Sequence, residues 1–326
     1  MSTRLLAGAL LALVSPLLVA PSAHAAAPAY VALGDSYSSG TGTRDYLADG
    51  TSCQRSTRAY PSLVAAARGY ALNFRACSGA TVADVTKTQL SALSASTAYV
   101  TISVGGNDAG FADVLTECAL PWWAGDCNGA IDDAQAFVRN TLPARLATLY
   151  SSIRTKAPNA KVVVVGYPRI FMGEDCNALT WFSPAEESRL NQTADLLNSR
   201  TQTAASNRGF SFANPTNRFL GHAVCDDPEW INGLSNPISE SYHPNKPGHA
   251  SGYTPTVSPL LTGSAVAVTR TVRRDAAEMA PALTDQQREY AAADSVIEPE
   301  SFVAPDPGAL RDAAREQGRD RWLARN

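Results

Sequence analysis

The 326-residue sequence lacks several features that would mark whole classes of protein. It has 27 basic and 30 acidic residues, a formal net charge of −3, and no basic block along the chain. A chain without a basic patch is a poor partner for nucleic acid. No internal apolar run reaches the roughly 18 residues that a membrane-spanning helix needs. These absences exclude a DNA-binding protein and a multi-pass membrane protein.

The rest of the composition is that of a chain that folds. Apolar residues make up 45% of the sequence and charged residues 17%. That balance supplies enough apolar side chains for a buried core and argues against disorder throughout. At roughly 150 residues per domain, the length fits one large domain or two ordinary ones. We therefore expect a globular protein.

Residues 1–25 have the pattern of a secretory signal. Arg4 supplies the positive charge, and an apolar stretch follows it. Positions 21–25 read P-S-A-H-A and end in the small residues that signal peptidase needs. A membrane anchor is the alternative, but the apolar stretch is short and a cleavage site follows it. We expect cleavage near Ala25, a secreted protein and no stable membrane insertion.

Export to an oxidising compartment explains why the chain has an even number of cysteines that can pair. The chain has six, an even number, and thiols pair in an oxidising compartment. A zinc site is the alternative, but there is no C-x-x-C and no histidine pair at ligand spacing. Many pairings are possible in principle. Joining sequence neighbours is the simplest, because it closes three separate loops: Cys53–Cys77, Cys118–Cys127 and Cys176–Cys225.

Five short segments have the composition of buried strands, because they are nearly apolar, rich in β-branched residues and bounded by turn residues. Strands of parallel sheets look like this when helices cover both faces. Helix-like stretches lie between them, at 61–68, 82–94, 130–157 and 184–207. The alternation predicts a three-layer α/β/α domain whose ligand binds outside the carboxyl ends of the strands. The expected strands are 30–33, 72–76, 99–104, 161–166 and 210–213.

The alternation stops near Gly263. Beyond it the sequence is dense in Arg, Asp, Glu and Ala, and four prolines cut it into short pieces. Stretches 284–293 and 309–324 have the composition of solvated helices. No core-forming face is visible, so we expect segment 264–326 to be a charged, partly disordered or helical tail.

Polar blocks follow the predicted strands. Positions 34–37 read G-D-S-Y directly after the first strand, where Ser36 can meet a substrate. This is not the G-x-S-x-G elbow of the common α/β-hydrolases, which occurs nowhere in the chain. Positions 105–108 read G-G-N-D after the third strand. There glycines allow close approach of a ligand, and the Asn107 amide is a neutral donor.

Two further blocks complete the set. Gly79 follows the second strand and offers an unhindered main-chain N–H. His243 lies late in the chain, in the loop sequence H-P-N. These four blocks, in this order, resemble the SGNH (GDSL-type) hydrolase family over about residues 28–262. The resemblance is closest to the secreted, disulfide-bonded lipases and esterases of actinobacteria, which share the six-cysteine layout and its neighbour pairing.

The resemblance implies a fold and a set of roles. The fold is a three-layer α/β/α sandwich with a mostly parallel, flavodoxin-like five-stranded sheet, here forming a catalytic domain at 28–263. Ser36 would be the nucleophile that forms an acyl-enzyme, and His243 the general base and then acid. The main-chain N–H groups of Ser36 and Gly79 and the side chain of Asn107 would hold the oxyanion.

The third member of the triad is where this sequence departs from the family pattern. Most members have Asp three residues before the histidine, and this chain has Glu240 there. Some secreted members use instead a main-chain carbonyl two residues before the histidine, which is that of Ser241 here. Either group would hold the imidazole tautomer that accepts a proton from Ser36. The sequence leaves both open.

Two tryptophans are weaker candidates for contact with the substrate. Trp122 and Trp123 lie in the short loop that a Cys118–Cys127 bridge would close. Such a loop buries two rings poorly, so the pair could contact an acyl chain or lipid surface, or pack on a neighbouring loop.

Four polar residues near these motifs are expected to be structural. The carboxylates of Asp35 and Asp108 suit bracing of their own loops. His222 neighbours a predicted bridge, and His249 a predicted helix start.

Together these features predict a serine hydrolase that cleaves carboxylic esters, with no metal or organic cofactor. The resemblance favours lipid or fatty-acyl esters, and removal of acetyl groups from carbohydrate is the enzymatic alternative. A non-catalytic secreted binding module is the alternative of another class. The presence of Ser36, Asn107 and His243 together argues against it. We expect a monomer whose partner is a small-molecule or lipid ester.

Overall fold

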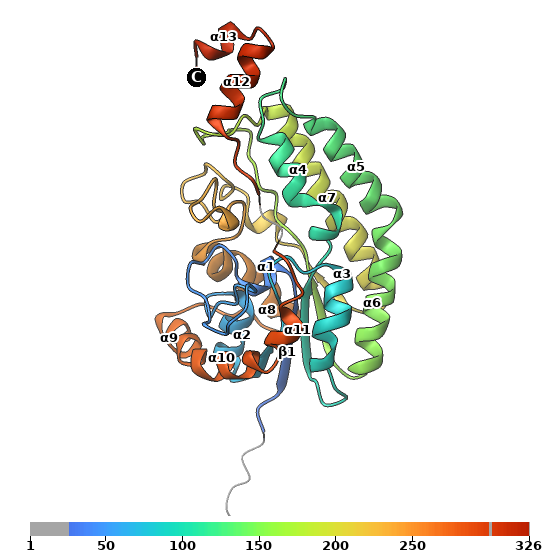
Figure 1. Ribbon diagram of the computed structural model, residues 1–326. Helices are drawn as coiled ribbons and strands as arrows, with labels where there is room; N and C mark the ends of the chain where they lie inside the picture. The colour runs from blue at the N-terminus through green and yellow to red at the C-terminus, as the bar shows by residue number, and fades with distance from the viewer. Residues whose placement is uncertain (1–25, 300–301, 326) are drawn as a thin grey trace, which may run out of the picture.

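The computed structural model describes residues 26–299 and 302–325, so the predicted signal at 1–25 lies outside the described residues. Five strands form one sheet in the order β2-β1-β3-β4-β5, and every pairing is parallel. Helices pack on both of its faces (Figure 1). The predicted α/β/α class is therefore confirmed. The strands are β1 (Ala29–Gly34), β2 (Ala71–Phe74), β3 (Tyr99–Ser103), β4 (Lys161–Val165) and β5 (Ser211–Ala213).

The central strands are buried on both faces, which explains their apolar composition. In β4, four consecutive valines follow the exposed Lys161, and all four are buried. Helices α2 (Tyr60–Arg68) and α8 (Thr254–Thr262) lie on one side of the sheet. The long helices α5 (Cys127–Asn140), α6 (Leu142–Lys156) and α7 (Pro184–Ser206) lie on the other (Figure 1).

Two predicted helices are less regular than expected. The single helix predicted over 130–157 is wrong, because α5 ends and α6 begins around Thr141. Pro143 lacks an N–H and fits the first turn of α6, but not the interior of a continuous helix. The stretch predicted at 82–94 comprises α3 (Val82–Asp84), a π-turn (Val85–Gln89) and a 3-10 turn (Leu90–Ala92).

The segment after Gly263 packs on the domain, so the expectation that it has no core-forming face is wrong. Leu283, Ile297 and Phe302 are buried and belong to the main apolar core. The short helices of this segment bury at most two apolar side chains each, so no helix shows an apolar face by itself. The helices are α9 (Arg270–Glu278), α10 (Ala280–Arg288), α11 (Ala291–Asp294), α12 (Pro307–Glu316) and α13 (Asp320–Leu323).

A buried ion cluster fastens this segment to the domain. Asp294, at the end of α11, accepts hydrogen bonds from Arg55 and, at 2.7 Å, from Arg75. All three side chains are fully buried. The guanidinium of Arg75 also lies 3.8 Å from the ring centre of Tyr290. Because Arg75 directly follows β2, the cluster ties the end of α11 to the edge of the sheet.

The structure joins the six cysteines as sequence neighbours, as predicted: Cys53–Cys77, Cys118–Cys127 and Cys176–Cys225. The first bridge holds the loop after β2 beside the serine block, and there the Cys77 N–H donates to the Gly34 carbonyl at 2.9 Å. The second links the end of α4 (Phe111–Cys118) to the start of α5. Within the described ranges, every helix is too short or too polar to cross a membrane.

Candidate active site

Ser36 lies at the carboxyl end of β1, where it begins the short helix α1 (Ser36–Ser39). The residue at position 34 must be glycine for this geometry. Gly34 has φ +120°, and a Cβ there would lie 2.2 Å from the carbonyl oxygen of Ser103 on β3. Because β1 and β3 lie so close together at Gly34, the chain continues past the sheet there and places Ser36 at its carboxyl end.

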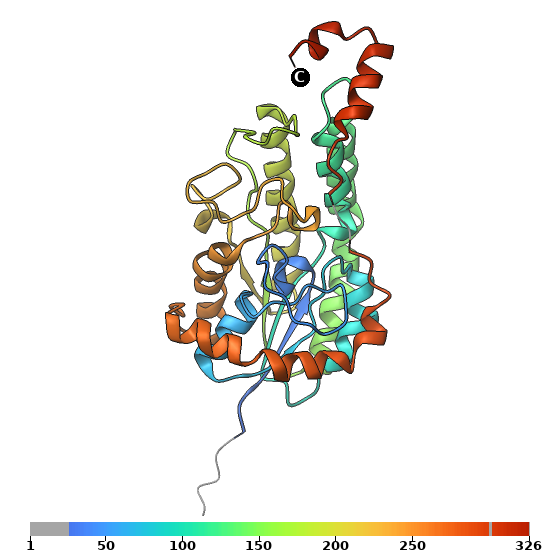
Figure 2. The same cartoon turned by 60° about the vertical axis from the view of Figure 1, so that its left-hand side comes forward.

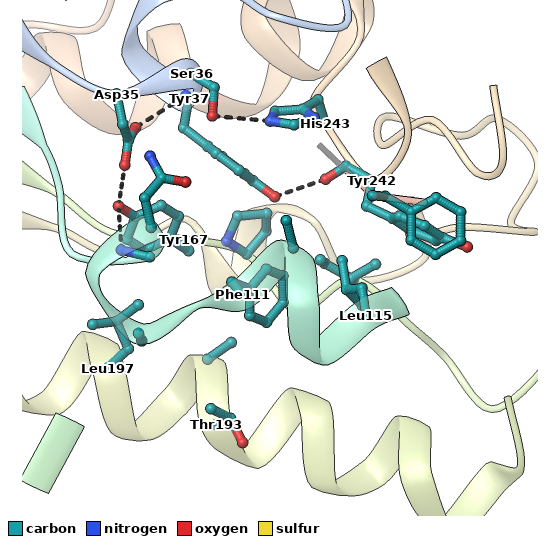
Figure 3. A pocket seen from close by; sticks show the side chains of 18 of the residues that line it. Asp35, Ser36, Tyr37, Phe111, Leu115, Tyr167, Thr193, Leu197, Tyr242 and His243 are labelled. Atoms are coloured by element: carbon teal, nitrogen blue, oxygen red, sulfur yellow. Dashed lines mark hydrogen bonds between the residues drawn. The ribbon is translucent and has the colours of Figure 1, made fainter. Parts of the chain in front are cut away.

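The structure brings Ser36 and His243 together (Figure 3). The Ser36 hydroxyl oxygen lies 2.9 Å from Nε2 of His243, and Nδ1 of His243 lies 2.9 Å from the main-chain oxygen of Ser241. A carbonyl oxygen can only accept, so Nδ1 carries the proton and donates it. Nε2 is therefore free to accept the hydrogen bond of the serine hydroxyl.

Glu240, the other candidate for the third position, is bound elsewhere. Its buried carboxylate accepts hydrogen bonds at 2.7 Å from the Arg44 guanidinium and at 2.7 Å from the Tyr46 hydroxyl. Among the described residues, the carboxylate makes no hydrogen bond to His243. Burial lowers the pKa of His243 to about 4, against the opposing effects of the Ser241 carbonyl and the negative charge of Glu240.

The three predicted oxyanion donors lie in separate segments that follow β1, β2 and β3. Asn107 begins the turn after β3, and its Nδ2 donates to the Ala80 carbonyl at 3.0 Å, which fixes the amide. Within the described part of the chain, the main-chain N–H groups of Ser36 and Gly79 have no protein acceptor. Ser36 and Asn107 line the same cavity as His243, whereas Gly79 lies outside that lining.

Asp108 braces two of these loops, as expected. Its buried carboxylate accepts from the Val82 N–H at 2.8 Å and from Arg145 at 3.2 Å. Val82 begins the helix after the Gly79 loop, and Asp108 follows Asn107, so one carboxylate holds the second and third blocks together. Desolvation raises the pKa of this carboxyl.

A buried network beneath Ser36 escaped the sequence analysis. The Asp35 carboxylate accepts from the Ser103 hydroxyl at 2.6 Å, from the Tyr37 N–H at 3.0 Å and from the hydroxyl of Tyr167. Burial raises the pKa of Asp35 to about 6. Tyr167 lies two residues after the end of β4, so its place near a strand's carboxyl end was the available signal, although no motif marks it.

A second tyrosine connects the serine and histidine blocks. The Tyr37 hydroxyl donates to the Tyr242 carbonyl at 2.8 Å, and the Tyr37 ring centre lies 5.3 Å from that of His243 (Figure 3). The neighbours of Ser36 and His243 are therefore hydrogen-bonded to each other, which holds the two loops together at the Ser36–His243 contact.

An apolar cavity of about 60 Å³ lies beside the Ser36–His243 pair. Helix α4 supplies Phe111 and Leu115, and α7 supplies Leu197 (Figure 3). The Ser36 hydroxyl and the oriented histidine therefore lie next to a space that suits an apolar group.

Comparison with known proteins identifies the family. Residues 32–251 match the GDSL-like Lipase/Acylhydrolase family. The chain belongs to this family. Lipase 1 of Streptomyces coelicolor is 44% identical over 244 residues, which are 74% of this chain and 88% of that one. The lipase of Streptomyces rimosus is 42% identical over 231 residues, 70% of this chain and 85% of that protein.

Two solved structures agree with this. The extracellular lipase of Streptomyces rimosus superposes with a TM-score of 0.68 at 41% identity, over 72% of this chain and 100% of that one. Phospholipase A1 from Streptomyces albidoflavus NA297 superposes with a TM-score of 0.68 at 42% identity, over 72% of this chain and 99% of that one. This GDSL-family protein is accordingly a carboxylic ester hydrolase.

The remaining predicted residues lie apart from the cavity of this GDSL hydrolase. Trp122 is 75% exposed with Arg319 over its ring, and Trp123 packs on Trp322 of α13. Neither tryptophan lines the cavity. His222 stacks on Trp230, with ring centres 3.7 Å apart. His249 is buried and accepts from the Tyr60 N–H at 3.4 Å.

One group of side chains among the described residues has the spacing of a metal site: Cys176, Cys225 and Glu229. The two sulfur atoms are already joined in a disulfide. A disulfide sulfur is not a thiolate, so this group lacks the ligands that a soft metal needs.

Proposed function

We propose that this protein hydrolyses fatty-acyl esters through an acyl-enzyme on Ser36. The observation that carries the proposal is the 2.9 Å contact between the Ser36 hydroxyl and His243 Nε2 beside an apolar cavity. Apolar walls suit an acyl chain better than a carbohydrate, whose hydroxyls need polar partners. Relatives called lipase and phospholipase A1 support the same class.

The acylation step follows from the proton positions. The Ser36 oxygen attacks the ester carbonyl carbon while its proton passes to Nε2 of His243. The imidazolium that forms is stabilised by the Ser241 carbonyl, which still accepts from Nδ1–H, and by the nearby charge of Glu240. The C–O bond to the leaving group then breaks, and Nε2 returns the proton to the departing alcohol.

Deacylation repeats the sequence with water. His243 takes a proton from a water molecule that attacks the acyl-Ser36 ester, and then returns it to the serine oxygen. In both steps the negative charge on the carbonyl oxygen is held by the N–H groups of Ser36 and Gly79 and by the Asn107 amide. Each such donor contributes about 10²–10³-fold to turnover.

We also propose that the protein is secreted and acts as a monomer. The signal pattern at 1–25, three disulfides and the extracellular lipase among its relatives support secretion. The contacts of His243 with Ser36 and with the Ser241 carbonyl form within one chain, so the proposed mechanism needs no second subunit.

Replacing the nucleophile tests this function. Ser36→Ala should lower kcat for p-nitrophenyl butyrate by about 10³-fold or more, as should His243→Ala, because the two act as a unit. Ser188→Ala, at an exposed serine of α7, is the matched control and should leave kcat unchanged. A phosphonate ester should add its mass to the wild type and not to Ser36→Ala. Equal turnover by wild type and Ser36→Ala contradicts the proposal.

A further inference from the structure

A stretch of the C-terminal segment lies across the proposed site. We call residues 297–299 and 302–304 the strap. In Figures 1 and 2 the chain runs from α11 to α12, which lies at the opposite end of the molecule. The strap lies between these two helices in the sequence. It therefore passes the carboxyl end of the sheet, where the proposed catalytic groups lie.

The strap contacts the domain on both sides of the site. On one side, a Cβ added at Gly79 would lie 2.4 Å from the Glu298 carbonyl oxygen and 2.6 Å from Cα of Pro299. On the other side, the Val303 N–H donates to the Thr116 hydroxyl of α4 at 3.0 Å. The strap main chain therefore packs directly on the Gly79 loop and is held again at α4.

Phe302 lies between these two contacts and points inward. It is 4% exposed, and its ring centre lies 5.0 Å from that of Tyr242, the neighbour of His243. Phe302 lines the same cavity as Ser36 and His243. The strap thus places one aromatic ring in the wall of the proposed acyl pocket.

This part of the wall is additional to the family domain. The family match ends at residue 251, and the other apolar walls, such as Phe111 and Leu197, lie inside the matched region. The extracellular lipase of Streptomyces rimosus is covered completely by 72% of this chain. Phe302 therefore adds a wall to this pocket from outside the matched region.

We infer that Phe302 is a specificity-determining residue that limits the length of the acyl chain. The inference rests on the proposed function. With the ring in place the cavity measures about 60 Å³. A water-sized group needs about 10–15 Å³ of such free volume, so the space takes roughly four to six of them. That suits a butyryl group, whereas an octanoyl chain has to extend beyond this space.

A longer chain gains room inside the pocket only if the ring leaves its position, and the structure opposes that. Moving the ring outward exposes a buried aromatic side chain and breaks its contact with Tyr242. The strap is also anchored just before it begins, where buried Asp294 binds Arg55 and Arg75. Phe302 is therefore held as a fixed wall.

The test compares two esters. Phe302→Ala should raise the ratio of kcat/KM for p-nitrophenyl octanoate over butyrate by about tenfold or more, because several methylene groups gain a place in the pocket. Phe302→Leu should give a smaller rise in the same direction. Val303→Ala is the matched control, since Val303 is the next residue and 62% exposed, and its ratio should equal that of the wild type.

Three results are decisive against the inference or its basis. An unchanged ratio in Phe302→Ala, or an equal fall for both esters, overturns the role of Phe302 while leaving the ester hydrolase intact. Should Phe302→Ala fail to fold, the ratio of Phe302→Leu decides in the same way. A wild type that hydrolyses neither ester, with a normal melting curve, contradicts the proposed function itself.

Discussion

The imidazole of His243 donates its Nδ1 proton to the main-chain oxygen of Ser241 at 2.9 Å. The carboxylate of Glu240, the residue before Ser241, instead accepts hydrogen bonds from Arg44 and Tyr46. A main-chain oxygen is held by the local fold and needs no side-chain conformation to be correct. Orientation of His243 therefore depends on the turn at 238–241, which Glu240 stabilises through its two partners.

Glu240→Gln tests whether Glu240 orients His243 itself or only stabilises the turn at 238–241. A triad carboxylate that holds the histidine is worth about 10⁴-fold in kcat. Because the Ser241 carbonyl makes the hydrogen bond here, we expect Glu240→Gln to lower kcat by less than about tenfold, while the lost ion pair lowers the melting temperature. Steady-state kinetics with p-nitrophenyl butyrate and a thermal melt measure both. A loss near 10⁴-fold at unchanged stability would assign the orienting role to Glu240 instead.

The acid limb of the profile of kcat/KM against pH should lie at an unusually low pH. Catalysis needs neutral His243, and burial lowers its pKa from 6.5 to about 4. We expect kcat/KM to fall only as the pH drops through about 4, so that at pH 5 about nine-tenths of the neutral-pH value remains. A midpoint near 6.5 would show an ordinary histidine.

Acid unfolding must be separated from this titration. His243 and His249 are both held neutral by burial, His249 with a pKa of about 3. At pH values between 6.5 and these two pKa values, the unfolded chain binds more protons than the folded one. The free energy of unfolding therefore falls as the pH drops through this range. Circular dichroism at each pH is the control, and only points at which the protein stays folded count.

The sheet and the catalytic blocks could be predicted because they depend on local sequence. The valines of β4 form an apolar run because the strand is buried on both faces. Ser36 lies two residues after the end of β1 and Asn107 four residues after the end of β3, so the topology alone brings them to one edge. The pairing of the six cysteines followed from the same simple order along the chain.

The parts that could not be predicted depend on contacts between distant residues. Phe302 lies in a segment without apolar periodicity, and only its contact with Tyr242 shows what it does. Asp294 looks like one of many surface charges in the sequence, yet it is fully buried between two arginines. Tyr167 has no motif around it, and its role depends on Asp35, which is 132 residues away in the sequence.

Asp294→Ala tests whether the C-terminal segment is part of the fold. The change leaves Arg55 and Arg75 buried without their shared anion, and breaking a buried ion pair from one side costs about 3–5 kcal/mol. We expect the free energy of unfolding, measured with urea, to fall by that amount. The matched control is Asp285→Ala in α10, whose pair with Arg288 is exposed on both sides and contributes about 1 kcal/mol at most. Equal effects of the two changes would mean that segment 264–326 contributes no stability through this cluster and that its helices only lie against a domain already complete without them.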